Sequence, residues 1–233
     1  MPWKNKTTLF FDLDHTLWDF DRNAAETLEE LYDQYDLKRL GIDTAQTFID
    51  CYTELNHALW AQYHLGQIDK ETLRSSRFKN TFSSLGLDPN ALPTNFEEDY
   101  IRLCPYKPHL FPGTLEVLDY LSSTYNLHLI SNGFHASSHI KIATCGLAPF
   151  FKKIVISETV GFHKPDPAIF KFAMDQAQAN QSACVMIGDS IEADVRGALN
   201  TGMDAILFNP KGCPPPEDIP LSIRTLYELK ELF

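Results

Sequence analysis

Short apolar runs that alternate with helical segments constrain the fold of this chain more than any other feature. After residue 106, apolar runs predict buried strands at residues 127–130, 154–156, 183–187 and 205–208. Between them, helices are predicted at residues 114–124, 136–145 and 191–201, with another that begins at Asp166–Pro167. This alternation is typical of βαβ units, so we expect an α/β protein with a Rossmann-like parallel sheet covered by helices on both faces.

Residues 19–105 have a different pattern. Apolar and aromatic side chains recur there at helical spacing, and no convincing strand is present. Asp43 and Gln46 resemble a capping box at the start of one of these helices. Because this segment separates the first strand from the others, we expect an inserted all-helical domain at residues 18–106 and a core domain formed by residues 1–17 and 107–233.

Composition and charge exclude several classes of protein. A net charge of −11 disfavours a nucleic-acid polymer or an anionic membrane surface as the main partner. No apolar run is long enough to cross a bilayer, and the N-terminus meets an aspartate before a signal-peptide core can form. The five cysteines are scattered and lack CxxC spacing, which is typical of reduced thiols. We therefore expect a cytoplasmic protein.

The stretch TLFFDLDHTLWDF, residues 7–19, contains the first predicted strand and two acids directly after it, Asp12 and Asp14. Parallel strands deliver their carboxyl ends to one edge of a sheet, where ligands bind. The other predicted strands lead to further polar side chains at that edge. These are Ser131 and Asn132 after the second strand, Lys164 after the third, and Asp189, Glu192 and Asp194 after the fourth.

This set of side chains is suited to phosphoryl chemistry. Two or three carboxylates can hold Mg²⁺, which prefers oxygen ligands. A lysine, a hydroxyl and the backbone N–H groups of a tight turn can bind phosphoryl oxygens, and a further aspartate can attack phosphorus. Each motif alone could be an ordinary strand end, turn, loop lysine or helix cap. Four of them in order, each after a predicted strand, favour a site.

The order DxDxT, then SN, then KP, then GDSxxxD resembles the haloacid dehalogenase superfamily, whose members are mostly phosphatases. The resemblance covers residues 7–20 and about 108–208, and the helical insert resembles the type 1 cap of that family. It implies that Asp12 is the nucleophile that forms an aspartyl-phosphate. Asp14 would be the general acid that protonates the leaving oxygen and then the base that activates water.

The same resemblance implies the binding residues. Thr16, Ser131, Asn132 and Lys164 are expected on the substrate side, with Thr16 supporting the loop by hydrogen bonding and with Ser131 and Lys164 holding phosphoryl oxygens.

The resemblance also implies a magnesium site. Magnesium would be bound by Asp12, by the backbone carbonyl of Asp14 and by Asp189. Asp194 would orient metal-bound waters or Lys164, and Glu192 is expected to be a solvated neighbour.

Several reactions share this residue set. The presence of Asp14 and of the acids in GDSIEAD favours a phosphorylated substrate over a 2-haloacid. DHTLWDF and SNGF resemble bacterial pyrimidine 5′-nucleotidases, and Trp18 or Phe134 could stack on a base. We therefore expect a small phosphorylated partner, a nucleoside 5′-monophosphate, and a monomer or homodimer. A sugar-phosphate phosphatase, a phosphomutase and a non-catalytic phosphate-binding module remain alternatives.

Overall fold

The computed structural model describes Trp3 and residues 5–233, which form two compact units. The core unit contains Met1–Asp19 and Pro108–Phe233, and the helical unit is Phe20–Lys107. The expected boundaries lay at residues 18 and 107. Trp18 belongs to the core unit because its backbone forms bridges with Asp14 and Leu110, which lie on either side of the inserted segment.

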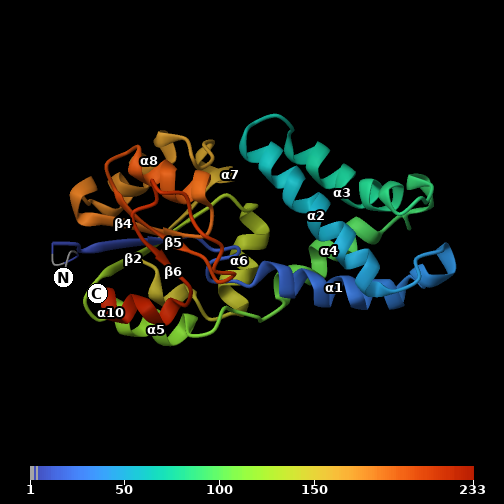
Figure 1. The fold of residues 1–233 in the computed structure, drawn as a ribbon, viewed down its shortest axis with the longest axis horizontal. Helices are drawn as coiled ribbons and strands as arrows, with labels where there is room; N and C mark the ends of the chain where they lie inside the picture. Colours follow the sequence, from blue (N-terminus) through green and yellow to red (C-terminus); the bar gives the residue numbers. More distant parts are fainter. Residues whose placement is uncertain (1–2, 4) are drawn as a thin grey trace. The chain divides into compact units, whose positions relative to one another are not determined.

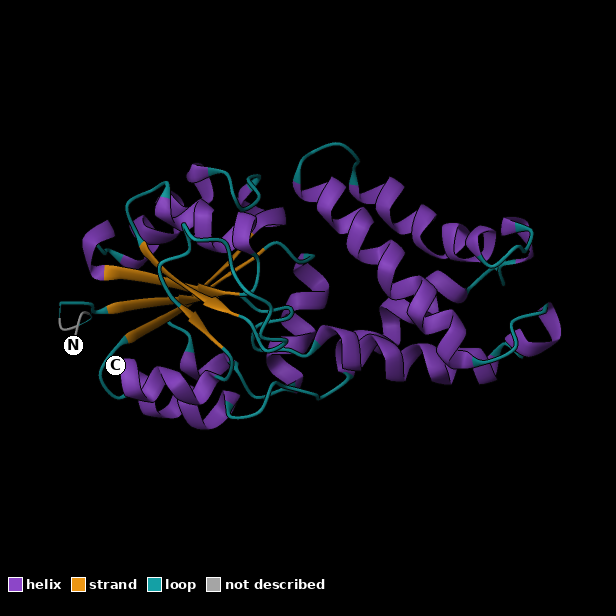
Figure 2. Cartoon of the chain, viewed as in Figure 1, coloured by secondary structure: helices purple, strands orange, loops and turns teal. Residues whose placement is uncertain are grey.

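The core unit is built on a six-stranded parallel sheet with the strand order β3-β2-β1-β4-β5-β6. The sheet is drawn in Figures 1 and 2. The strands are β1 (Thr8–Phe11), β2 (Asn126–Ser131), β3 (Lys153–Ile156), β4 (Cys184–Gly188), β5 (Asp204–Phe208) and β6 (Ser222–Ile223). Apolar residues that are buried on both faces explain why β1 and β4 occupy the centre. The predicted α/β class with a parallel sheet is confirmed.

Helices cover both faces of this sheet. Helices α5 (Thr114–Ser122) and α10 (Leu229–Leu232) lie on one side, and α8 (Pro167–Ala177) lies on the other (Figure 1). Phe170 of α8 packs in a buried cluster with Phe10 of β1 and Met186 of β4. The remaining helices of the core unit are α6 (His135–Thr144), α7 (Ser157–Val160) and α9 (Gly197–Leu199).

Two local features of the core unit differ from the prediction. Residues 191–201 do not form one regular α-helix, because Ile191–Arg196 is a π-helical turn that precedes α9. This turn lets Asp194 reach back and accept a hydrogen bond from the Ser190 N–H at 3.0 Å. The two-residue strand β6 was not predicted, since it is too short for an alternating pattern.

The helical unit contains α1 (Phe20–Gln34), α2 (Ala45–His64), α3 (Lys70–Ser84) and α4 (Phe96–Leu103), and no strand occurs in it (Figure 2). The predicted capping residues of α2 are wrong: the N-cap is Thr44, whose hydroxyl accepts from the Thr47 N–H at 3.1 Å. Either residue type can cap a helix, so only the backbone conformation distinguishes Thr44 from Asp43. Among the described residues, no helix is both long and apolar enough to cross a membrane.

Aromatic rings form the interior of the helical unit. Phe78 of α3 lies 5.0 Å from Tyr52 of α2 and 4.9 Å from Phe96 of α4, measured between ring centroids. Arg77 is 4% exposed in this interior, with its guanidinium 4.7 Å above the Tyr100 ring. Rings spaced at helical intervals therefore serve as packing here, as their periodicity indicates.

Candidate active site

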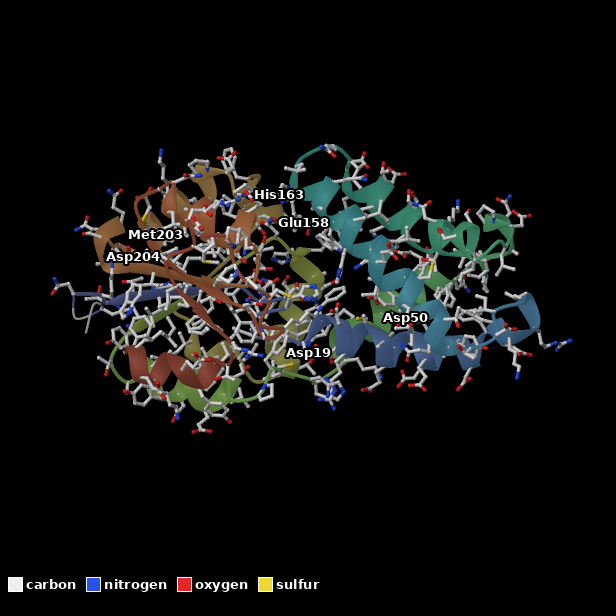
Figure 3. The ribbon with its side chains drawn as sticks, in the orientation of Figure 1. Asp19, Asp50, Glu158, His163, Met203 and Asp204 are labelled. Carbon is white, nitrogen blue, oxygen red and sulfur yellow. The ribbon has the colours of Figure 1, made fainter. Side chains whose placement is uncertain are left out.

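Polar side chains of the core unit gather where the central strands end. Asp12 follows β1, and its N–H donates to the Ile187 carbonyl at 2.9 Å, which extends the pairing of β1 with β4 past the strand. In Figure 3, Glu158 and His163 mark the end of the sheet where the strands finish, because both residues follow β3. Asp204 begins β5 and marks the opposite end. The candidate site lies at the end where the strands finish.

Lys164 is the centre of this site. Its side chain is 1% exposed, and its ammonium donates to Asp12 Oδ1 at 2.5 Å and to Asp194 Oδ1 at 2.6 Å. A third bond, 2.8 Å long, goes to the Ile130 carbonyl. These bonds use all three ammonium protons, so the lysine joins the ends of β1, β2 and the π-turn.

Asp189 completes a cluster of acids. Its Oδ1 accepts from the Thr16 hydroxyl at 3.1 Å, and Thr16 is fully buried. Carboxylate oxygens of Asp12, Asp189 and Asp194 all lie within 4.8 Å of one another. Gly188 permits this approach, because a Cβ at position 188 would clash with the Asp194 carboxylate. The structure thus brings together the acids that the sequence placed at residues 12, 189 and 194.

The charges of this cluster do not balance. Three carboxylates (−3) face one ammonium group (+1), which leaves a formal charge of −2. Burial, reinforced by Asp194, raises the pKa of Asp12 to about 7 despite the opposing effect of Lys164. Burial and the charge of Asp12 likewise raise the pKa of Asp189 well above its ordinary value. Oxygen ligands with this excess of negative charge suit a divalent cation.

The turn after β2 contributes both a donor and a support. The Ser131 hydroxyl accepts from the Gly133 N–H at 3.0 Å, which leaves its own proton to donate. Asn132 makes two bonds to the backbone of Lys164, with its amide donating at 2.9 Å and its oxygen accepting at 2.8 Å. Both polar atoms of the Asn132 side chain are therefore used within the protein, where they orient Lys164.

Asp14 has a partner that none of the sequence motifs predicts. The ammonium of Lys141, on α6, lies 2.5 Å from Asp14 Oδ1 and 4.0 Å from the centre of the Trp18 ring. Lys141 is 127 residues from Asp14, so only its place between Ile140 and Ile142, in a segment predicted to be helical, could have suggested burial. Trp18 is fully buried beneath this ammonium, and we therefore do not assign it a base-stacking role.

His15 and Glu192 lie beside the motif acids in the sequence but are not members of the acid cluster. His15 has a φ of 64°, in the left-handed region where glycine is favoured, and its N–H donates to the Trp18 carbonyl at 2.9 Å. Glu192 pairs with Arg196 on the surface and does not belong to the acid cluster.

The residues at this sheet edge match a known family. The sequence of residues 9–208 matches the family of haloacid dehalogenase-like hydrolases. These residues contain every motif described above. The chain belongs to this family and is a hydrolase of the haloacid dehalogenase-like class.

Individual relatives match nearly the whole chain. It is 34% identical to the pyrimidine 5′-nucleotidase PynA of Streptococcus pneumoniae, covering 87% of this chain and 83% of that protein. It is 31% identical to the pyrimidine 5′-nucleotidase YjjG of Escherichia coli, covering 96% of each. The structure of the HAD-hydrolase YfnB of Bacillus subtilis, solved with magnesium bound, superposes with a TM-score of 0.86 at 28% identity, covering 98% of this chain and 99% of that one.

Proposed function

We propose that this protein is a magnesium-dependent phosphatase that hydrolyses pyrimidine nucleoside 5′-monophosphates. The observation that carries the phosphatase proposal is the sharing of Lys164 by Asp12 and Asp194, with Asp189 in reach of both. The names of the relatives PynA and YjjG support the nucleotide substrate. A phosphoryl group carries negative charge, so it needs the cations that this cluster holds or attracts.

In the proposed first step, a carboxylate oxygen of Asp12 attacks phosphorus. The P–O bond to the nucleoside breaks as Asp14 gives its proton to the leaving oxygen, and an aspartyl-phosphate remains on Asp12. During this step the Ser131 hydroxyl donates to a phosphoryl oxygen, and Lys164 exchanges one of its three bonds within the protein for a bond to another phosphoryl oxygen. Lys164 can do so in its charged form, because burial, which alone would lower its pKa, is outweighed by Asp12 and Asp194, which raise it.

In the second step, Asp14 is a carboxylate and takes a proton from water. The resulting hydroxide attacks phosphorus, the bond to Asp12 breaks, and inorganic phosphate leaves. Asp14 thereby regains the proton that it gave in the first step, so the cycle is balanced and needs no other reactant.

Magnesium would be held by Asp12, Asp189 and the backbone carbonyl of Asp14, with Asp194 beside them. It would neutralise the excess charge of this cluster and favour the ionised form of Asp12, whose pKa is otherwise raised by burial.

The test is a phosphate-release screen over nucleoside monophosphates, sugar phosphates and small phosphorylated acids, with Mg²⁺ and with chelator. We expect pyrimidine nucleoside monophosphates to release phosphate when Mg²⁺ is present and not when chelator is present. Asp12→Asn should lose activity by at least about 10³-fold, whereas Asp175→Asn, on the exposed face of α8, should keep it.

Three outcomes would contradict parts of this proposal. Folded protein that releases no phosphate from any ester would favour a binding module. Preference for sugar phosphates would overturn the nucleotide assignment alone. Turnover by the Asp12→Asn variant would identify another nucleophile.

A further inference from the structure

Lys141 lies outside all the motifs that place the protein in its family, yet it contacts the proposed proton donor. It belongs to α6 (His135–Thr144), and its side chain is 7% exposed. Its ammonium donates to Asp14 Oδ1 at 2.5 Å. Burying a lysine costs side-chain entropy and hydration, so its position calls for a compensating role.

The loop after β1 holds Lys141 from two directions. The carboxylate of Asp14 contacts the ammonium on one side. The ring of Trp18 lies on another, with its centroid 4.0 Å from the ammonium. Asp14 and Trp18 are also bridged to each other through the backbone, and the His15 N–H donates to the Trp18 carbonyl at 2.9 Å. A single cation therefore contacts both ends of this turn, which limits the positions open to the Asp14 side chain.

The second oxygen of Asp14 has different surroundings. A Cβ placed on Gly133 would lie 3.2 Å from Asp14 Oδ2 and 3.1 Å from the Ser131 hydroxyl oxygen. Oδ2 and Ser131 thus approach the same face of the Gly133 backbone. Because Lys141 contacts Oδ1, Oδ2 is the oxygen that lies beside the turn expected to hold the phosphoryl group.

We propose that Lys141 is a positioning residue, which fixes Asp14 through Oδ1 so that the transferred proton is carried on Oδ2, beside Ser131. This inference rests on the proposed function, because it assigns a role to a group that acts through Asp14. An ammonium can donate to Oδ1 whether or not Oδ2 carries a proton, so the contact can persist through both steps of the reaction. A positioned donor of this kind contributes about 10²–10⁴-fold to the rate.

Two other roles for Lys141 predict different kinetics. A lysine that binds the phosphoryl group directly would be needed equally for every phosphate ester. A lysine that only stabilises the fold would change the amount of folded protein but not the selectivity among esters. A lysine that positions the proton donor is needed most when the leaving oxygen requires a proton.

The experiment compares kcat/KM for an aryl ester, p-nitrophenyl phosphate, with kcat/KM for an alkyl ester, a pyrimidine nucleoside 5′-monophosphate. The aryl group leaves as a stable anion, whereas the alkoxide must be protonated. Because kcat/KM reports events up to the first irreversible step, it is insensitive to later hydrolysis of the aspartyl-phosphate. The variants are Lys141→Met and Lys141→Arg, and Lys171→Met, an exposed lysine on α8, is the matched control.

We expect Lys141→Met to lower kcat/KM for the alkyl ester by about 10²-fold and for the aryl ester by less than about fivefold. Lys141→Arg should restore the alkyl activity to within about tenfold of the unchanged protein, since it keeps the donor to Oδ1. Lys171→Met should match the unchanged protein with both esters.

Equal losses with both esters, or no loss, would overturn the positioning role while leaving the phosphatase proposal in place. If Lys141→Met does not fold, Lys141→Gln, which removes the charge and shortens the side chain, takes its place: an unchanged ratio of alkyl to aryl activity would overturn the role, and a lowered ratio would support it. An unmodified protein that is inactive with both esters would instead refute the proposed function itself.

Discussion

Lys164 in the core unit and Arg77 in the helical unit are both buried cations, but they face different numbers of carboxylates. Arg77 makes two bonds to one acid, Glu97, at 2.9 Å and 2.7 Å, and its guanidinium lies near the rings of Phe78 and Tyr100. Lys164 is shared by Asp12 and Asp194, with Asp189 nearby. Glu97 also contacts the partly exposed Arg74 at 3.4 Å, so this site has no excess of carboxylate, whereas the Lys164 cluster retains a formal charge of −2.

This difference separates packing from chemistry. A planar guanidinium that matches one carboxylate satisfies both groups and leaves nothing to bind a further ion. Excess buried carboxylate is unfavourable for the fold, and its pKa values are raised accordingly. Such an arrangement is expected where a cation and an anionic substrate complete it, which is why the balance of charge is more informative than burial alone.

The largest expected effect is the loss of activity in Lys164→Met. Removing the ammonium leaves the three acids of the cluster without a protein cation, which opposes the approach of an anionic phosphoryl group. We expect kcat/KM with p-nitrophenyl phosphate to fall by about 10³-fold or more, which corresponds to about 4 kcal/mol. Activity within tenfold of the unchanged protein would show that Lys164 is only a structural counter-ion.

Arg77→Met should chiefly reduce stability. Glu97 would lose both bonds to Arg77 and keep the longer 3.4 Å contact with the partly exposed Arg74. Breaking a buried pair in this way costs about 3–5 kcal/mol. Urea unfolding measures the change, and the double variant Arg77→Met/Glu97→Leu should recover most of it, since both charges are then removed. A single variant that loses under about 1 kcal/mol would mean that the pair is well hydrated.

The raised pKa of Asp12 predicts a pH-dependent instability in chelator. The folded pKa of about 7 exceeds the unfolded value of 3.8, so the folded state holds its proton longer. Stability from this group is present below pH 4 and is lost as the pH rises to about 7, by up to about 4 kcal/mol. The free energies of unfolding of the unchanged protein and of Asp12→Asn should therefore differ more as the pH rises. Mg²⁺ should reduce this difference. A gap that stays constant with pH would refute the excess of buried charge.

His128 is a third buried ionisable side chain of the comparison, and within the described part of the chain it has no carboxylate beside it to stabilise a positive charge. Among the described residues, neither of its ring nitrogens has a hydrogen-bond partner, and burial, with Lys152 and Lys153, lowers its pKa to about 4. The unfolded value is 6.5, so stability from the neutral ring is lost as the pH falls from 6.5 towards 4, by up to about 3 kcal/mol. His128→Phe should remove this acid sensitivity in chemical unfolding, and His139→Phe, on the exposed face of α6, should not. Equal acid sensitivity in both variants would exclude His128 as its source.

The fold was largely predictable from local pattern. Apolar runs placed strands β2 to β5 close to their observed positions, because buried parallel strands produce continuous apolar runs. Prediction failed where the signal is short or depends on backbone detail. Strand β6 has two residues, the π-turn at Ile191–Arg196 shares its composition with an α-helix, and the α2 cap depends on which of two polar residues adopts the extended conformation.

For the site, local pattern was enough to predict which side chains the ends of parallel strands bring to one edge: Asp12, Asp14, Ser131, Lys164 and Asp189. Strand direction suffices for that, since every parallel strand ends at the same edge. How those groups share their hydrogen bonds depends on the packing of distant elements and could not be predicted in this way. Asn132 is used to orient the Lys164 backbone, and Lys141 reaches Asp14 from a helix 127 residues away. Such contacts depend on how a helix packs on the sheet and on side-chain direction, which no local pattern encodes.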